Sequence, residues 1–176
     1  FNLGSMCCLP KKSHDTDNKG RSVYSPEETR PLVIVNTDNT LLASAARNKW
    51  ETTLAKWISL DQQGFVKGRS ILKDLLEVET AMMLRALRDP NSSALFLDFA
   101  AAFPSISQDY MFAILEDLGI PQKAIRSVKA LYNNSNCDIN IQGHNEDGFE
   151  LLAGVRQGCP LSPLLYAIVA EYLLDY

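Results

Sequence analysis

The sequence has few of the residues that define several common protein classes. Its 176 residues contain two histidines and four cysteines, and no two cysteines have the C-x-x-C spacing of zinc or redox motifs. Neighbouring cysteines at 7 and 8 do not suggest a disulfide framework, so reduced thiols in an intracellular protein are the simpler interpretation. No apolar run approaches the length of a membrane span, and no signal peptide is visible. Zinc proteins, disulfide-rich secreted domains and membrane proteins are therefore disfavoured.

Charge is also sparse, and it is unevenly distributed. The chain is 46% hydrophobic and 22% charged, which is typical of a globular protein with one core or two small subdomains. Its net charge of −4 argues weakly against a nucleic-acid partner. However, residues 1–69 contain ten Lys and Arg and seven Asp and Glu, whereas residues 70–176 contain seven Lys and Arg and fourteen Asp and Glu. The basic part can meet phosphates, while the acidic part can hold a metal.

The periodicity of apolar residues predicts an α+β fold without internal repeats. We expect a polar loop over residues 10–31 and a domain boundary near residues 89–93. Because the chain starts with Phe and ends inside a helical pattern, we expect it to be a fragment of a longer protein. The predicted helices cover residues 38–58, 70–88, 108–118, 121–132 and 162–175. Thr37 or Asp38 is the expected N-cap of the first of these helices, and Ser107 is the expected N-cap of the third. The predicted strands cover residues 32–35, 94–99, 137–142 and 149–153, the last two as a hairpin.

The stretch GVRQGCPLSPLLY, residues 154–166, combines two glycines with an Arg-Gln pair at the start of a predicted helix. Gly154 and Gly158 allow a positive φ or a close approach of the backbone to another molecule. A free-standing Arg156-Gln157 pair at a helix N-terminus would attract anions and polar ligands. A strand-to-helix turn with two solvated side chains fits the same residues, and local physics favours this plainer interpretation.

Two further segments have candidate functional residues. Asp98 lies near the end of the apolar run ALFLDF, where a carboxylate needs a backbone N–H or a cation as partner. GFVKGRS, residues 64–70, does not fit a P-loop, because its glycines are too close together and no strand precedes it. An unrelated α/β enzyme with a phosphate loop is therefore disfavoured, although a basic glycine loop can still contact a phosphate backbone.

Five segments together resemble the reverse transcriptase domain of non-LTR (LINE-type) retrotransposons, with group II intron enzymes as more distant relatives. In order, they are LPKK, RPLVIVNTDNTLL, DQQGFVKGRS, LFLDFAAAFPSI and GVRQGCPLSPLLY. The resemblance runs from about residue 9 to residue 174. It implies a right-hand polymerase fold, with residues 1–92 as mostly helical fingers and residues 93–176 as an incomplete palm with an antiparallel sheet. The chain would stop before the aromatic-Ala-Asp-Asp hairpin that supplies the other catalytic carboxylates.

The resemblance also assigns a metal site and part of a nucleotide site. Asp98 would be the first catalytic carboxylate and would coordinate both Mg²⁺ ions, with the backbone carbonyl of Phe99 as a further ligand. Phe103 matches the aromatic residue that stacks under the sugar and rejects a 2′-hydroxyl. Arg30 falls in the motif whose basic side chain helps to hold the triphosphate.

In the remaining two motifs, the resemblance assigns contacts with the incoming nucleotide and with the template. Gln157 would touch the nucleotide or the nascent pair, and Gly158 would let the backbone come close. Lys67 and Arg69 would face the template backbone.

The implied activity is RNA-directed DNA synthesis, a nucleotidyl transfer with an RNA template, a DNA primer and deoxynucleoside triphosphates. We expect the chain by itself not to polymerise, because Asp98 alone cannot assemble a two-metal site. Ala100, Ala101 and Pro104 depart from the family pattern. The alternative is therefore a catalytically inactive retroelement remnant, at most a nucleic-acid-binding module. We expect no membrane partner and a location in the cytoplasm or nucleus.

Overall fold

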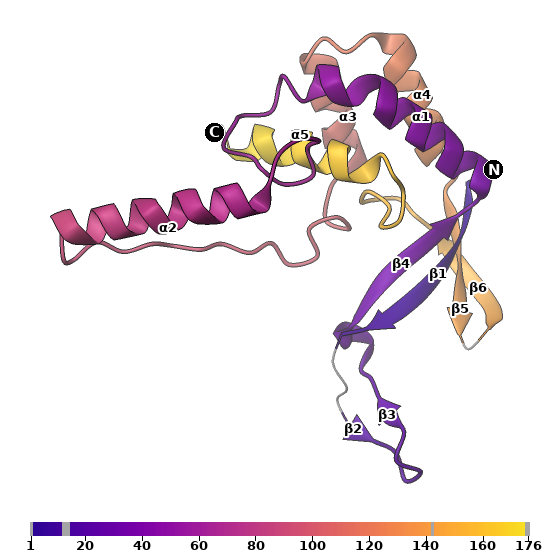
Figure 1. Cartoon of the computed structure of the whole chain (residues 1–176). Coiled ribbons are helices and arrows are strands. Elements are labelled where there is room, and N and C mark those ends of the chain that lie inside the picture. Colours follow the sequence, from indigo (N-terminus) through magenta and orange to yellow (C-terminus); the bar gives the residue numbers. More distant parts are fainter. Residues whose placement is uncertain (1, 12–14, 142, 175–176) are drawn as a thin grey trace.

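The computed structural model describes residues 2–11, 15–141 and 143–174, and these combine α-helices with a β-sheet (Figure 1). The α-helices in this part of the chain are α1 (Thr37–Leu54), α2 (Ile71–Arg88), α3 (Gln108–Asp117), α4 (Gln122–Tyr132) and α5 (Ser162–Leu174). Each of them corresponds to a helix that the sequence predicted. The mixture of helices and strands is therefore confirmed. No helix within the described ranges is both long and apolar enough to cross a lipid bilayer.

The main sheet has four strands in the order β4-β1-β5-β6. Its strands are β1 (Leu3–Pro10), β4 (Thr29–Val35), β5 (Asn136–Ile141) and β6 (His144–Glu150). β1 pairs with β4 and β5 pairs with β6 in antiparallel fashion, whereas β1 and β5 are parallel. The prediction of an antiparallel sheet is therefore wrong in one ladder, and the sheet is mixed. The cause is β1, a strand that the sequence did not predict and that lies between β4 and the predicted hairpin.

Two short elements lie between β1 and β4, where the sequence predicted only a loop. Strands β2 (Asp15–Thr16) and β3 (Ser22–Val23) form a separate two-stranded sheet, and the 3₁₀ helix η1 (Pro26–Glu28) follows. The Asp17 carboxylate accepts hydrogen bonds from the backbone of Lys19 and Arg21 in the connecting turn. These contacts close the turn, and β4 then runs back along β1.

Side-chain caps explain where two of the helices begin. Asn36 caps α1 by accepting from the Asp38 N–H at 2.9 Å, one or two residues before the predicted cap. Ser107 caps α3 by accepting from the Tyr110 N–H at 3.3 Å, as the sequence predicted. Gly119, with φ of +69°, ends the same helix.

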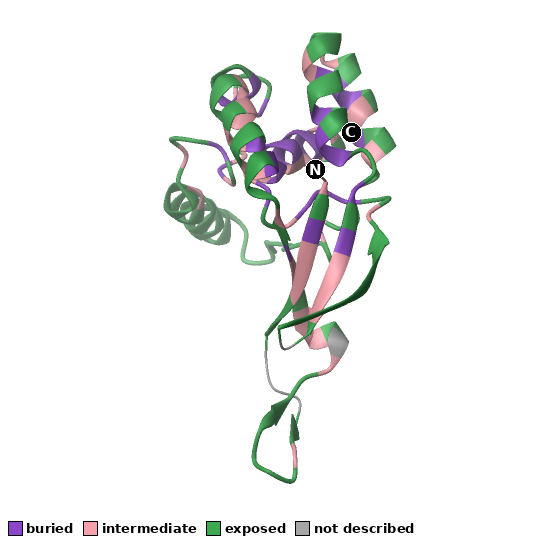
Figure 2. Ribbon diagram, turned by 90° about the vertical axis from the view of Figure 1, so that its right-hand side faces the viewer, coloured by how far each residue is buried: buried purple, intermediate pink, exposed green. Residues whose placement is uncertain are grey.

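The core lies where α1, α3, α4 and α5 meet the loop that leads into α5 (Figure 2). Its fully buried side chains include Met111, Ile125, Leu161, Leu164 and Ala167. Residues from both sides of position 92 contribute, since Ala43 and Leu54 of α1 belong to the same cluster. The sheet also joins residues 3–35 to residues 136–150. The segments predicted as fingers and palm therefore share one core.

The prediction of a central strand over residues 94–99 is wrong. In the structure this run is an exposed segment without regular secondary structure that follows α2, and Leu95 and Leu97 are 83% and 80% exposed. α2 itself has no buried residue, and it projects away from the other helices (Figure 1). A strand needs a neighbouring backbone to complete its hydrogen bonds, and among the described residues nothing pairs with this run. The apolar composition of residues 94–99 is typical of a buried strand, but composition does not show whether a neighbouring strand is present to pair with it.

Candidate functional site

The loop at residues 154–159 packs against the edge of the main sheet. The Val33 N–H on β4 donates a 3.0 Å hydrogen bond to the Gln157 carbonyl. Gly158 has φ of +109°, and a Cβ there would lie 2.6 Å from the Val33 carbonyl oxygen. Only glycine permits this approach. Gly158 therefore brings the loop against β4 and fixes the position of Gln157, whose side chain is partly exposed.

A second segment, residues 99–106, docks on the same loop. The Gly154 N–H donates to the Ile106 carbonyl at 2.6 Å, and the Val155 N–H donates to the Phe103 carbonyl at 2.9 Å. Gly154 has φ of +79°, and a Cβ there would lie 2.8 Å from the Cα of Pro104. The two glycines of the GVRQG stretch thus admit two different neighbours from the protein's own backbone. The sequence predicted a positive φ at these glycines or a close approach to another molecule. Both glycines have a positive φ, and the close neighbours are segments of the same chain.

An aromatic cluster joins a third segment to the first two. Phe65, Phe103 and Tyr166 come from the 64–70 loop, the 99–106 segment and α5. The ring centroids are 5.7 Å apart for Phe65 and Phe103, and 4.9 Å apart for Phe103 and Tyr166. Phe65 and Tyr166 complete the triangle at 6.1 Å. Such contacts stabilise by about 0.5–1.5 kcal/mol per pair beyond simple burial. Segments that lie far apart in the sequence therefore converge on one place.

Arg156 is buried, whereas the sequence predicted a free-standing side chain. It is 5% exposed, and its guanidinium lies 5.2 Å from the centroid of the Tyr132 ring. The Tyr132 hydroxyl shares a 3.1 Å hydrogen bond with the hydroxyl of Ser162, at the start of α5. Burial, together with the nearby Cys159 thiol, raises the pKa of Tyr132 above its ordinary value. The Tyr132 ring is a favourable neighbour for this cation, but the Nε, Nη1 and Nη2 atoms of Arg156 are buried without a hydrogen-bond partner among the described residues. Nothing in the local sequence indicates that Tyr132 lies there.

The two predicted template contacts differ in their surroundings. Lys67 is exposed. Arg69 is half-buried, and its guanidinium donates to backbone carbonyls of the turn that follows α1. Those carbonyls belong to Ala55, Ile58, Ser59 and Gln62. Arg69 therefore braces the loop internally, and Lys67 remains the cation that faces outward from it. Lys67 and Arg69 are both basic residues next to Gly68, so the sequence does not indicate which of them is exposed and which contacts the backbone of the same chain.

The predicted metal ligands do not form a metal site by themselves. Asp98 lies in the exposed segment and makes no hydrogen bond or ion pair with another described residue, and Phe99 is 59% exposed. A carboxylate oxygen is the donor type that Mg²⁺ prefers, but one such group is too few. Within the described ranges, no cluster of three or more His, Cys, Asp or Glu side chains could hold a metal ion.

The remaining predicted residue, Arg30, lies on β4 and is exposed. It pairs in register with Leu9 of β1 and precedes Val33 by three positions. Because Val33 bonds to the Gln157 loop, β4 connects Arg30 to the converging segments through a regular strand. The candidate site thus consists of the 154–159 loop, the 99–106 turn, the 64–70 loop and β4.

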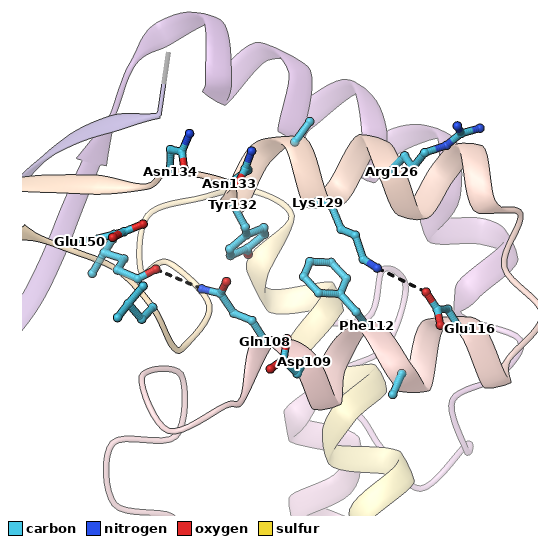
Figure 3. A pocket seen from close by; sticks show the side chains of 14 residues that line it. Gln108, Asp109, Phe112, Glu116, Arg126, Lys129, Tyr132, Asn133, Asn134 and Glu150 are labelled. Carbon is cyan, nitrogen blue, oxygen red and sulfur yellow. Dashed lines mark hydrogen bonds and ion pairs between the residues drawn. The ribbon is translucent and has the colours of Figure 1, made fainter.

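A separate hollow of about 780 Å³ lies between α3, α4 and the end of β6 (Figure 3). It contains none of the predicted site residues, and its charges are of both signs. Lys129 pairs with Glu116 at 3.3 Å, and the Gln108 amide donates to the Leu151 carbonyl at 3.4 Å. Its lining has three carboxylates, from Asp109, Glu116 and Glu150, and two cations, from Arg126 and Lys129. The hollow therefore has a small negative net charge and does not favour an anionic ligand.

Comparison with known protein families identifies the family to which this chain belongs. A sequence profile described as reverse transcriptase (RNA-dependent DNA polymerase) matches residues 9–175, which is almost the entire chain. The chain belongs to the reverse transcriptase family. The segments that converge in the structure are the motifs that suggested this family from the sequence, and enzymes of the family bind a nucleic-acid template and a primer.

The similar proteins are encoded by retroelements. An uncharacterised 149 kDa protein of transposon TX1 from Xenopus laevis is 27% identical over 145 residues, which is 82% of this chain and 11% of the relative. The Pol polyprotein of element R2DM from Drosophila melanogaster is 27% identical over 155 residues, which is 85% of this chain and 14% of the relative. An R2 polyprotein of Popillia japonica is 24% identical over 157 residues, 89% of this chain and 22% of the relative. The chain is thus a reverse transcriptase domain of a LINE-type element and spans less than a quarter of each relative.

Proposed function

We propose that this reverse transcriptase domain provides the nucleotide-facing loops of an RNA-directed DNA polymerase. The observation that carries this proposal is the convergence of three sequence motifs. Backbone hydrogen bonds join the 154–159 loop to the 99–106 turn, and the Phe65–Phe103 contact adds the 64–70 loop. A polymerase needs such loops to be held rigidly before the substrate binds, because positioning supplies much of the rate acceleration in phosphoryl transfer.

Each converging residue has a role in this proposal. Gln157 and Gly158 border the incoming deoxynucleoside triphosphate, and Phe103 lies under its sugar and rejects a 2′-hydroxyl. Arg30 on β4 contacts the triphosphate. Lys67 contacts the template backbone, and Arg69 supports that contact by bracing the loop from within.

The metal site is proposed to be completed by residues outside this sequence. Asp98 and the Phe99 carbonyl would supply part of the coordination of two Mg²⁺ ions, whose role is to stabilise the negative charge of the reacting phosphates. In this proposal, residues 1–92 belong to the fingers and residues 93–176 to the palm. The exposed run at 94–99 would then pair with the aromatic-Ala-Asp-Asp hairpin, which would also bring the other carboxylates close to Asp98.

Primer extension on an RNA template tests the proposal. With Mg²⁺, the 176-residue chain should give no extension, whereas a longer chain of the same element with the hairpin should give full-length DNA. In that longer chain, Phe103→Ala should raise ribonucleotide incorporation relative to deoxynucleotide incorporation, since the steric barrier to the 2′-hydroxyl is removed. Phe65→Ala is the matched control, because it removes a ring of the same cluster that lies outside the proposed sugar site. Equal effects of both substitutions would contradict the role of Phe103.

A second candidate is a catalytically inactive remnant that binds nucleic acid. It is favoured by Ala100, Ala101 and Pro104, which stand where the family usually has charged residues and an Asp. A longer chain that contains the hairpin, folds and binds RNA but never extends a primer would support the remnant. Extension by that chain would exclude it.

A further inference from the structure

A groove of about 580 Å³ lies between α1 and α4, apart from the converging motifs. Its walls come from the end of α1, the turn between α3 and α4, and the first residues of α4. The chain has two tryptophans, Trp50 and Trp57, and both of them line this groove. The proposed function uses neither of them.

Trp57 is presented to the solvent by a fixed backbone. Trp57 is 50% exposed, and its backbone N–H donates a 3.0 Å hydrogen bond to the Leu54 carbonyl. The Arg69 guanidinium donates hydrogen bonds to the backbone carbonyls of Ala55 and Ile58, which lie before and after Trp57 in the same turn. Trp50 lies two helical turns earlier and packs partly against the core. One tryptophan therefore anchors the wall of the groove, and the other presents a large part of its surface to an incoming ligand.

The charges of the groove are all positive. Lys49 and Lys123 line opposite sides, and no carboxylate belongs to the lining, although the whole chain has a net charge of −4. Neither ammonium has an ion-pair partner among the described residues. The hollow of Figure 3 differs, because there Lys129 is paired with Glu116. An anionic ligand with flat apolar parts would therefore complement this groove.

We propose that this groove binds single-stranded nucleic acid, with a base stacked on Trp57 and the adjoining phosphates beside Lys49 and Lys123. Single strands are bound in this way where aromatic side chains alternate with cations, and stacking tolerates any base. An apolar peptide would leave both lysines without a partner. A second copy of the chain on the same face would bring lysines against lysines. The groove lies on the opposite face of α1 from Arg47 and Glu51, which border the hollow beside Lys67, so it is a second contact and not the proposed template site.

Tryptophan fluorescence tests the proposal directly, since both reporters line the groove. A single-stranded oligonucleotide of 12 uridines should quench the emission of the 176-residue chain in a saturable titration. Trp57→Ala should weaken that binding about 5- to 150-fold, with Trp50 as the remaining reporter. Trp57→Phe, which keeps an aromatic face, should stay much closer to the unsubstituted chain. Urea midpoints of all variants confirm that they are folded.

The salt dependence of the same titration tests the lysines. The double substitution Lys49→Ala with Lys123→Ala should reduce the slope of log K against log salt by about 1.4, two released counterions at ~0.7 each on a single strand. The control is Lys11→Ala with Lys19→Ala, which removes the same charge from exposed positions near the small β2-β3 sheet and should leave the slope unchanged. An unchanged slope in the groove variant would overturn the proposal.

Three other results would also overturn it. These are saturable binding with no change in emission, equal quenching by a duplex of the same length, and quenching that follows protein concentration without any oligonucleotide. The last result would indicate self-association. Lys67→Ala separates this proposal from the proposed function, because it should weaken binding of a labelled template–primer while the quenching by 12 uridines persists. Loss of both signals in Lys67→Ala would mean that the groove is not an independent site.

Discussion

Two regions of the molecule are about equally apolar but differ in what covers them. In the body, α3, α4 and α5 bury their apolar side chains in one cluster around the loop that carries Gln157. In the arm, which comprises residues 71–100, α2 and the ALFLDF run expose theirs. An amphipathic pattern indicates that a segment has a side to bury, but it does not identify the partner. The loop that we propose to face the nucleotide lies in the body, and Asp98 lies in the arm.

The comparison predicts the largest difference for leucine substitutions in the two regions. Leu164→Ala in α5 should lower the free energy of unfolding by about 2–5 kcal/mol, because the side chain is fully buried and leaves a cavity. Leu76→Ala in α2 is the matched control, and it should stay within about 0.5 kcal/mol because that side chain is 62% exposed. Urea unfolding followed by circular dichroism measures both. Equal losses would show that the arm is packed in solution.

A glycine pair tests how the body holds its loop. Gly158→Ala should cost about 1–3 kcal/mol more than Gly68→Ala, because the new Cβ would lie 2.6 Å from the Val33 carbonyl oxygen. Gly68 also has a positive φ, of +81°, but a Cβ there meets nothing within 4 Å. The control therefore carries the backbone strain without the clash. Urea midpoints of the two variants give the difference, and equal midpoints would contradict the packing of the loop on β4.

The two basic residues of the 64–70 loop should separate stability from binding. Arg69→Ala should lower the free energy of unfolding by about 1–3 kcal/mol, since it leaves carbonyls of the turn after α1 without donors. Lys67→Ala should leave stability unchanged, because the side chain is exposed, and should instead weaken RNA binding. Thermal unfolding and anisotropy of a labelled RNA distinguish the two effects. If Arg69→Ala keeps its stability but binds RNA more weakly, Arg69 contacts the template directly, and its internal hydrogen bonds do not stabilise the fold.

The smallest expected effect concerns pH. Burial raises the pKa of Tyr132 in the folded state, so the folded chain holds this proton more tightly than the unfolded chain does. The resulting stability is fully present below the unfolded pKa of about 10 and falls as pH rises above it, by up to ~1.4 kcal/mol per pH unit. Tyr132→Phe should flatten this alkaline fall in melting temperature, and Tyr110→Phe, at a 40% exposed ring, is the control. An identical alkaline profile for Tyr132→Phe would remove Tyr132 as the cause.

The sequence predicted best where a local rule decides the structure. All five helices of the described chain were expected from apolar spacing, and Ser107 was identified as the cap of α3. The positive φ of Gly154 and Gly158 was also expected, because only glycine adopts such backbone angles readily. The family was recognised from the order of its motifs.

The sequence failed where a distant partner decides. β1 has no clear alternation, and it becomes a strand because β4 and β5 lie on either side of it. ALFLDF has a strand's composition but no neighbour in the described chain. Arg156 is buried beside the ring of Tyr132, which lies twenty-four positions away in the sequence, and Arg69 turns inward to carbonyls of a preceding turn. Local patterns cannot show such contacts between remote residues.

Amide hydrogen exchange on the 176-residue chain tests most directly whether the 154–159 loop, proposed to face the nucleotide, is ordered while the segment of Asp98 is not. Residues 94–99 should exchange as fast as an unstructured peptide, because their amides have no ladder partner. The amides of Gly154 and Val155, which donate to Ile106 and Phe103, should exchange far more slowly. Slow exchange at residues 94–99, at the level of the α5 core, would contradict the distinction between arm and body.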